Sequence, residues 1–188
     1  KISVYDPWEE SPFRTGVLTG NASVADNPDK NIDKVLGIAP NQTDKVVAFQ
    51  RSRHGGNAFG VRIDLKEPIR VTKLLQYIHV MAYLKKKPAD SRMMVMGLGK
   101  RLEKKWSWQT GEEEQFWALT NAPVKADEGW QDIVVSFKGF SYSKEESANN
   151  GIDIYSLVIV PDLRSPHADV SDWVAYFDEI VVDNNPNK

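Results

Sequence analysis

The stretch Leu74–Lys85, which reads LLQYIHVMAYLK, alternates with a strict period of two. Five of its six even positions are aliphatic, whereas three of the odd positions carry rings: Tyr77, His79 and Tyr83. A β-strand turns successive side chains to opposite faces, so the pattern predicts a strand with one face in a hydrophobic core. Rings that are apolar on the plane and polar at the edge suit a ligand that is itself half apolar and half hydroxylated. The alternative is a strand buried on both faces, with its rings under a loop.

Outward from this strand, the same kind of pattern recurs between clusters of Gly, Pro, Asn and Asp. The further candidate strands lie at Lys45–Arg51, Ala58–Leu65, Arg92–Lys100, Trp130–Phe137, Ile152–Val160 and Trp173–Asp183. About eight to ten short strands with turn signals between them predict an all-β protein, an antiparallel β-sandwich. The 188 residues fit one domain, 1–188, in which residues 1–20 form a loosely patterned N-terminal segment.

Composition excludes several classes of function. The absence of cysteine excludes disulfides, thiolate metal sites and a cysteine nucleophile. A net charge of -2, with both signs mixed along the chain, provides no field for nucleic acid or an acidic membrane. No run approaches the ~18 apolar residues of a transmembrane segment. The chain begins at Lys1, and we expect an exported bacterial protein (periplasm, cell surface or extracellular) whose signal was removed, although a cloning boundary would look the same.

Three segments carry a resemblance to a known family: residues 130–135 read WQDIVV, residues 154–159 read IYSLVI and residues 176–182 read YFDEIVV. From about residue 21 onward, the chain resembles the jelly-roll modules of the galactose-binding-like superfamily. The carbohydrate-binding modules attached to glycoside hydrolases of gut Bacteroidetes look most similar. The resemblance implies a jelly roll that binds a polysaccharide or oligosaccharide, with Trp130 in a structural role.

The resemblance also implies one structural calcium ion, because the acidic residue before the terminal Ile often ligates calcium in such modules. This makes Asp178 the candidate ligand. Calcium takes six to eight oxygen ligands, and Asp6 and Glu9 would share the site if the first and last strands pair. The alternative is that Asp178 caps a turn or pairs with a lysine.

Sugar binding needs aromatic platforms for the C–H faces and polar groups that converge on the hydroxyls. Tyr77, His79 and Tyr83 provide such a set, and Arg62 on the preceding strand is expected to point to the same side. The other candidate platforms are three tryptophans: Trp106, Trp108 and Trp117. We expect these residues to line a shallow concave groove on one sheet. The tyrosines and tryptophans would stack on sugar rings, while Arg62 and His79 would bind hydroxyls or a carboxylate.

Catalysis is less well supported by the sequence than binding. A glycosidase needs two carboxylates across a cleft, and the jelly-roll pattern Glu-x-Asp-x-x-Glu is absent. A polysaccharide lyase remains an alternative, because Arg62, His79 and Tyr83 are the residue types that neutralise a uronate and abstract its proton. A third possibility is an interaction domain without a sugar ligand, in which the aromatic face docks a partner.

Overall fold

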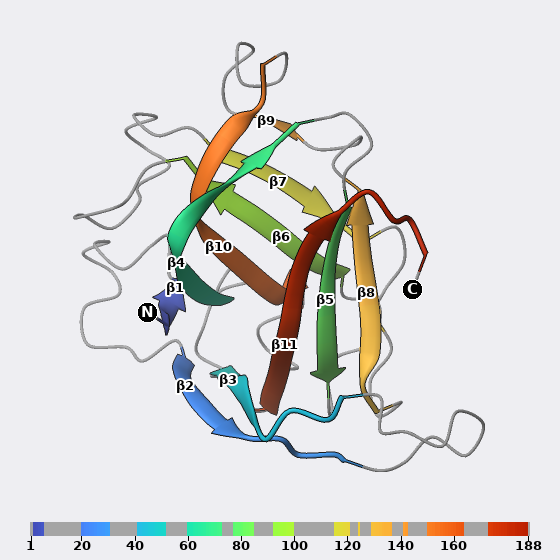
Figure 1. Ribbon diagram of the computed structural model, residues 1–188. Coiled ribbons are helices and arrows are strands. Elements are labelled where there is room, and N and C mark those ends of the chain that lie inside the picture. Colours follow the sequence, from blue (N-terminus) through green and yellow to red (C-terminus); the bar gives the residue numbers. More distant parts are fainter. Residues whose placement is uncertain are drawn as a thin grey trace, which may run out of the picture.

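The structure is a computed structural model of the 188-residue chain. It describes residues 2–5, 20–30, 41–51, 60–72, 77–84, 92–99, 115–120, 124, 129–136, 141–142, 150–163 and 173–187. Within these ranges the chain forms two antiparallel β-sheets (Figure 1). None of the described residues forms a helix long and apolar enough to cross a membrane.

The six-stranded sheet has the strand order β1-β4-β10-β6-β7-β9. Its strands are β1 (Ile2–Tyr5), β4 (Gly60–Val71), β10 (Ile152–Leu163), β6 (Arg92–Leu98), β7 (Gln115–Leu119) and β9 (Ser141–Tyr142). The five-stranded sheet has the order β2-β3-β11-β5-β8. Its strands are β2 (Gly20–Asp26), β3 (Lys45–Arg51), β11 (Trp173–Asp183), β5 (Tyr77–Leu84) and β8 (Gln131–Ser136).

The connections between the sheets follow jelly-roll topology. The chain passes from one sheet to the other between β1 and β2, β3 and β4, β4 and β5, β5 and β6, β7 and β8, β8 and β9, and β10 and β11. The inner strand orders β3-β11-β5-β8 and β4-β10-β6-β7 are those of a double-sheet jelly roll built from two Greek keys. The predicted fold is therefore confirmed, with β1, β2 and the two-residue β9 as additions.

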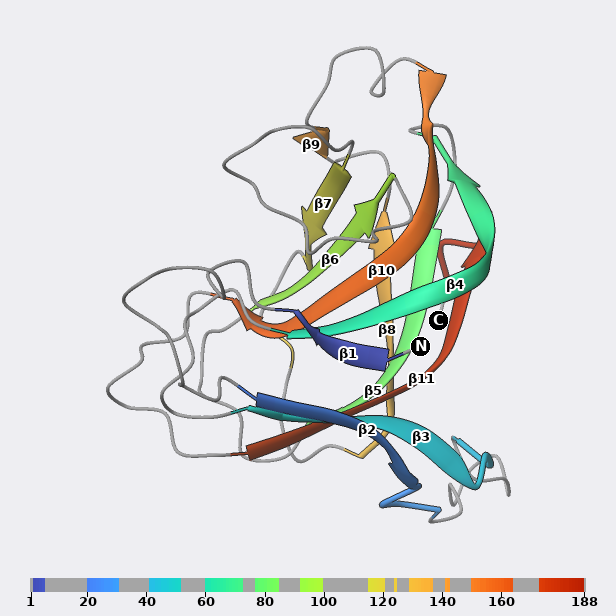
Figure 2. The same cartoon turned by 90° about the vertical axis from the view of Figure 1, so that its left-hand side faces the viewer.

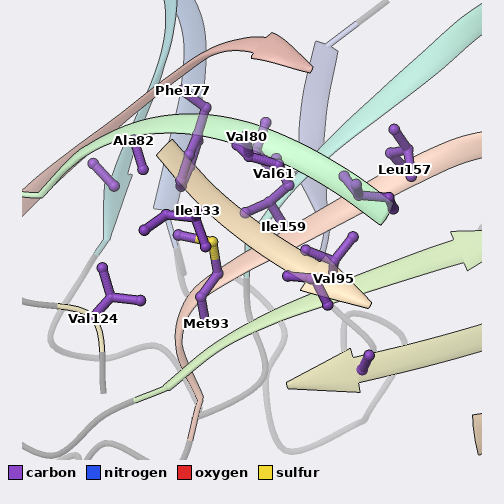
Figure 3. Packing of buried hydrophobic residues seen from close by; sticks show 14 of the residues in the cluster. Val61, Val80, Ala82, Met93, Val95, Val124, Ile133, Leu157, Ile159 and Phe177 are labelled. Carbon is purple, nitrogen blue, oxygen red and sulfur yellow. The ribbon is translucent and has the colours of Figure 1, made fainter. Parts of the chain in front are cut away.

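The hydrophobic core lies between the two sheets and is formed by the alternate residues of each strand (Figure 3). Phe177 on β11 and Ile133 on β8 face Met93 and Ile159 of the other sheet across this layer. Side chains of this kind each stabilise the fold by about 1.5–3 kcal/mol when they are fully buried. The face of each sheet that points away from this core is called its outer face here.

One boundary differs from the sequence-based prediction. The sequence predicts a strand over Ala58–Leu65, which ends before Pro68. Instead, β4 continues through it from Gly60 to Val71. The register against β10 shifts between Ile154 and Ser156, opposite this part of β4. Proline is tolerated at such a bulge, where a ladder hydrogen bond is already missing.

The two sheets are nested and curved. Figure 2 shows β4 and β10 bending along their length, with β11 running below them and following the same bend.

Candidate functional site

The alternation of β5 is confirmed, and its ring-bearing side is the outer face of the five-stranded sheet. Ile78, Val80, Ala82 and Leu84 are buried in the core. Tyr77, Met81 and Tyr83 are half-buried on the opposite side. This aromatic face therefore belongs to the outer face of the five-stranded sheet, and its part in ligand binding stays a prediction.

His79 binds three segments of the chain to one another. Its Nδ1 lies 3.2 Å from Asp132 Oδ2 on β8, and its Nε2 lies 2.9 Å from Asp183 Oδ1 on β11. The same Nε2 lies 2.8 Å from the carbonyl oxygen of Asn185. Acceptors at both nitrogens require N–H groups on both, which is the imidazolium form. With both nitrogens engaged within the protein, the structure gives His79 a structural role.

The environment raises the pKa of His79 above its ordinary value. Burial of the ring acts to lower the pKa, but other interactions outweigh it. These are the hydrogen bonds to Asp132 and to the Asn185 carbonyl, together with the negative charges of Asp132 and Asp183. His79 therefore holds β8 and the segment after β11 against the middle of the sheet most strongly when it is protonated.

Tyr83 is the centre of an aromatic cluster on this outer face. Its ring centroid lies 5.8 Å from that of Trp130 and 6.0 Å from that of Tyr176, in tilted and edge-on arrangements. Trp130 is buried, as the resemblance implied, and its Nε1 donates to Asn27 Oδ1 at 3.0 Å and to the Asp29 carbonyl at 2.9 Å. These rings therefore secure the connection between β2 and β3, in addition to packing on one another.

Asp178 takes part in the same attachment. Its Oδ2 accepts hydrogen bonds from the Asn41 side-chain amide, at 3.0 Å, and from the Thr43 hydroxyl. Within the described ranges, no group of three or more His, Cys, Asp or Glu side chains is placed to hold a metal ion. Asp178, Asn41 and Thr43 alone do not supply the six to eight oxygens of a calcium site. Asp6 and Glu9 lie outside the described residues, so calcium at Asp178 stays a prediction.

Arg62 is not where the sequence reasoning placed it. It lies on β4, in the six-stranded sheet, whereas Tyr77, His79 and Tyr83 lie on β5 in the five-stranded sheet. The alternation correctly predicts that Arg62 points outward, but β4 and β5, although consecutive along the chain, lie in opposite sheets. Its guanidinium and the β5 rings therefore project from opposite surfaces. For the same reason, Arg62, His79 and Tyr83 cannot form the active site of the lyase alternative.

A compact polar network surrounds Arg62 on the outer face of the six-stranded sheet. Arg62 Nε donates to Asp64 Oδ1 at 2.9 Å, and Nη2 lies 3.4 Å from Ser156 Oγ. The Ser156 hydroxyl donates to the same Asp64 oxygen at 2.6 Å. Arg62 and Ser156 are buried, while the Asp64 side chain is one-third exposed. The network thus reaches the surface at its carboxylate.

Arg62 also belongs to a row of residues in register across five strands. This row, here the Arg62 row, consists of Ser3, Arg62, Val158, Met96 and Trp117. Three strand spacings separate Arg62 from Trp117, which is about 14 Å. Two of the predicted site residues, Arg62 and Trp117, therefore lie on the same sheet face. The guanidinium lies on β4 and the half-buried indole on β7.

The residues around this row are apolar, which is unusual for the outer face of an antiparallel sheet. A second hydrophobic cluster lies on this face. Its members Met94, Met96, Leu98, Val158 and Val160 are buried, and the partly buried Trp117, Leu119 and Leu163 pack against them. Ligand sites are typically apolar surfaces that carry a few placed polar groups, and the Arg62 network is such a group. Trp106 and Trp108, the other predicted platforms, lie outside the described residues.

Asp64 and Ser156 were not identified from the sequence as candidate site residues. Asp64 could have been identified, because residues two positions apart in a strand lie on the same face, and Asp64 follows Arg62 by two. Ser156 is separated from Arg62 by 94 positions, and no local pattern connects them.

No known family model matches the chain, and no curated protein matches it either. Solved structures do match. A family 30 carbohydrate-binding module superposes with a TM-score of 0.49 at 9% identity, over 88% of this chain and 79% of that chain. The family 30 module of a cellulosomal cellulase of Clostridium thermocellum gives 0.47 at 11% identity, over 90% and 93%.

A third match is a Clostridium thermocellum xylanase structure that contains a family 22 binding module and was solved with xylohexaose. Its TM-score is 0.45 at 10% identity, over 89% of this chain. The present chain spans about a quarter of that structure, which includes a catalytic module, since it covers 25% of its length. Similarity at this level concerns strand arrangement, and the ligand has to be inferred from the residues of this chain. Membership of the galactose-binding-like superfamily and a Bacteroidetes origin stay predictions.

Proposed function

We propose that this domain binds a polysaccharide or oligosaccharide without cleaving it, on the outer face of the six-stranded sheet. The observation that carries the proposal is the Arg62 row, where Trp117 and the Arg62 network flank an apolar strip. The resemblance of the sequence to jelly-roll carbohydrate-binding modules points in the same direction.

The chemistry of each part follows from what a sugar presents. A pyranose offers an apolar C–H face, which stacks on the half-buried Trp117 indole. Its hydroxyls both donate and accept hydrogen bonds, and Asp64 at the surface and Arg62 beneath it provide the complementary groups. The network orients these groups before a ligand arrives, which lowers the entropic cost of binding.

Isothermal titration against a panel of soluble polysaccharides tests the proposal with two matched variants. Trp117→Ala and Tyr77→Ala each remove a half-buried ring, but from opposite outer faces. We expect Trp117→Ala to weaken binding about tenfold or more, which corresponds to about 1.4 kcal/mol, and Tyr77→Ala to leave it unchanged. Trp117→Phe, which retains the packing, controls for misfolding, and we expect an intermediate affinity.

Two results would overturn the proposal. If the folded wild-type chain binds no polysaccharide, the function is wrong. If Tyr77→Ala abolishes binding and Trp117→Ala does not, the domain still binds polysaccharide, but on the outer face of the five-stranded sheet, and the assigned surface is wrong.

A further inference from the structure

We propose that the Arg62 site selects uncharged glycans and discriminates against uronates, because the guanidinium of Arg62 is already paired with Asp64. The inference rests on the proposed function and narrows its ligand class. An arginine on a sugar-binding face is compatible with either a hydroxyl or a carboxylate as its partner, and the sequence left both open. The partner that the structure shows for Arg62 decides between them.

The Arg62–Asp64 pair is built into the sheet. Only about a tenth of the Arg62 side chain is exposed, at 11%, and its Nε donates to Asp64 Oδ1 at 2.9 Å. Ser156, itself buried, holds both partners from the neighbouring strand β10. Removing one member of a buried ion pair leaves an uncompensated charge, which costs several kcal/mol. A ligand carboxylate therefore cannot easily replace Asp64.

Asp64 stays ionised at neutral pH. Its partial burial acts to raise the pKa, but other interactions outweigh this effect. Hydrogen bonds from Ser156 and Arg62, with the positive charge of Arg62, leave the pKa below the ordinary value of an aspartate. A uronate approaching Arg62 would therefore meet the Asp64 carboxylate two residues along the same strand face. Like charges within about 4–6 Å disfavour each other's ionised form.

A neutral sugar meets no such penalty. Two of the guanidinium nitrogens, Nε and Nη2, donate within the network. Nη1 carries two further N–H groups, which match the lone pairs of a hydroxyl or ring oxygen. The rest of the Arg62 row is uncharged: Ser3, Val158, Met96 and Trp117. The Arg62–Asp64 pair and the rest of the row, as far as the structure describes them, thus add up to no net charge that would attract an acidic polymer.

The test compares polymers that differ only in charge. A β-glucan, a galactan and a mannan are each titrated beside the same polymer oxidised at C6, which turns primary hydroxyls into uronate carboxylates. We expect the wild type to bind the oxidised form of its preferred polymer at least tenfold more weakly than the neutral form. Binding of the neutral form should not change between 50 and 500 mM salt, because no net charge is involved.

Asp64→Asn sharpens the test, because it removes the negative charge and retains an oxygen that accepts from Arg62. We expect this variant to bind the oxidised polymer at least as well as the neutral one. Asp153→Asn is the matched control, since Asp153 pairs with Arg70 between the same two strands, β4 and β10, outside the row. It changes the net charge by the same amount and should preserve the wild-type preference.

The outcomes separate the two proposals. Equal or tighter binding of the oxidised polymer by the wild type overturns the charge selectivity and leaves glycan binding intact. A preference that Asp64→Asn does not change also overturns it. If the wild type binds neither form of any polymer, the proposed function itself is overturned. The wild-type comparison needs no variant, so the inference can be tested even if Asp64→Asn does not fold.

Discussion

The two outer faces of this sandwich both carry polar groups among apolar ones, but they use them differently. On the five-stranded sheet, His79, Trp130 and Asp178 bind segments that are distant in sequence: the connection between β2 and β3, β8, and the residues after β11. On the six-stranded sheet, Arg62, Asp64 and Ser156 bind one another on neighbouring strands. Polar residues on a sheet surface are therefore informative about function only after their intramolecular partners are known.

Among the variants that test this contrast, Trp130→Ala is expected to have the largest effect on stability. Trp130→Ala removes the ring contact with Tyr83 and both Nε1 hydrogen bonds to the β2–β3 connection. We expect the free energy of unfolding in urea to fall by about 3–5 kcal/mol, with the affinity of the folded protein for polysaccharide unchanged. Loss of binding in a Trp130→Ala protein that is still folded would make the five-stranded face part of the ligand site.

A smaller effect is expected at His79, and it depends on pH. Because the folded state raises the pKa of His79, its stabilisation is fully present below the ordinary value of about 6.5. It is lost as the pH rises through the folded-state pKa. At pH 6 we expect His79→Gln to be less stable than the wild type by about 1.5 kcal/mol. The difference in stability between the two proteins should narrow at alkaline pH. A constant difference between pH 6 and pH 9 would contradict the stabilising role of protonated His79.

The smallest effect concerns calcium at Asp178. If the sequence-based prediction holds, calcium raises the thermal midpoint and a chelator lowers it. A gain of about 1 kcal/mol corresponds to roughly 2–4 °C for a chain of this size. Asp178→Asn should abolish this response, while Asp153→Asn should retain it. No response of the wild type to a chelator would leave Asp178 solely as the anchor for Asn41 and Thr43.

Much of the fold could be predicted from alternation, because the face that a side chain occupies is a local property of a strand. The β5 pattern correctly separated Ile78, Val80 and Ala82 from Tyr77 and Tyr83. The sheet to which a strand belongs is not local. Arg62 was given the correct orientation and the wrong neighbours, because the jelly roll places β4 and β5 in different layers.

The candidate site shows the same limit. Arg62 and Trp117 were both singled out by residue type, yet only the pairing of β4, β10, β6 and β7 brings them into one row. His79 was chosen for its chemistry, and that chemistry is used by Asp132 and Asp183, which lie 53 and 104 positions away. No local pattern predicts partners at such separations.

The position of β11 has a consequence for how the protein folds. This strand, Trp173–Asp183, is inserted between β3 and β5, so that Phe177 pairs with Val47 on one side and Ala82 on the other. Such distant pairings bring a large loss of chain entropy before they are stabilised, which slows folding. Until β11 is synthesised and docked, β3 and β5 each expose an unpaired edge that another chain can occupy. The domain is therefore most vulnerable to aggregation before β11 docks, and a chaperone that shields these two edges would have its greatest effect then.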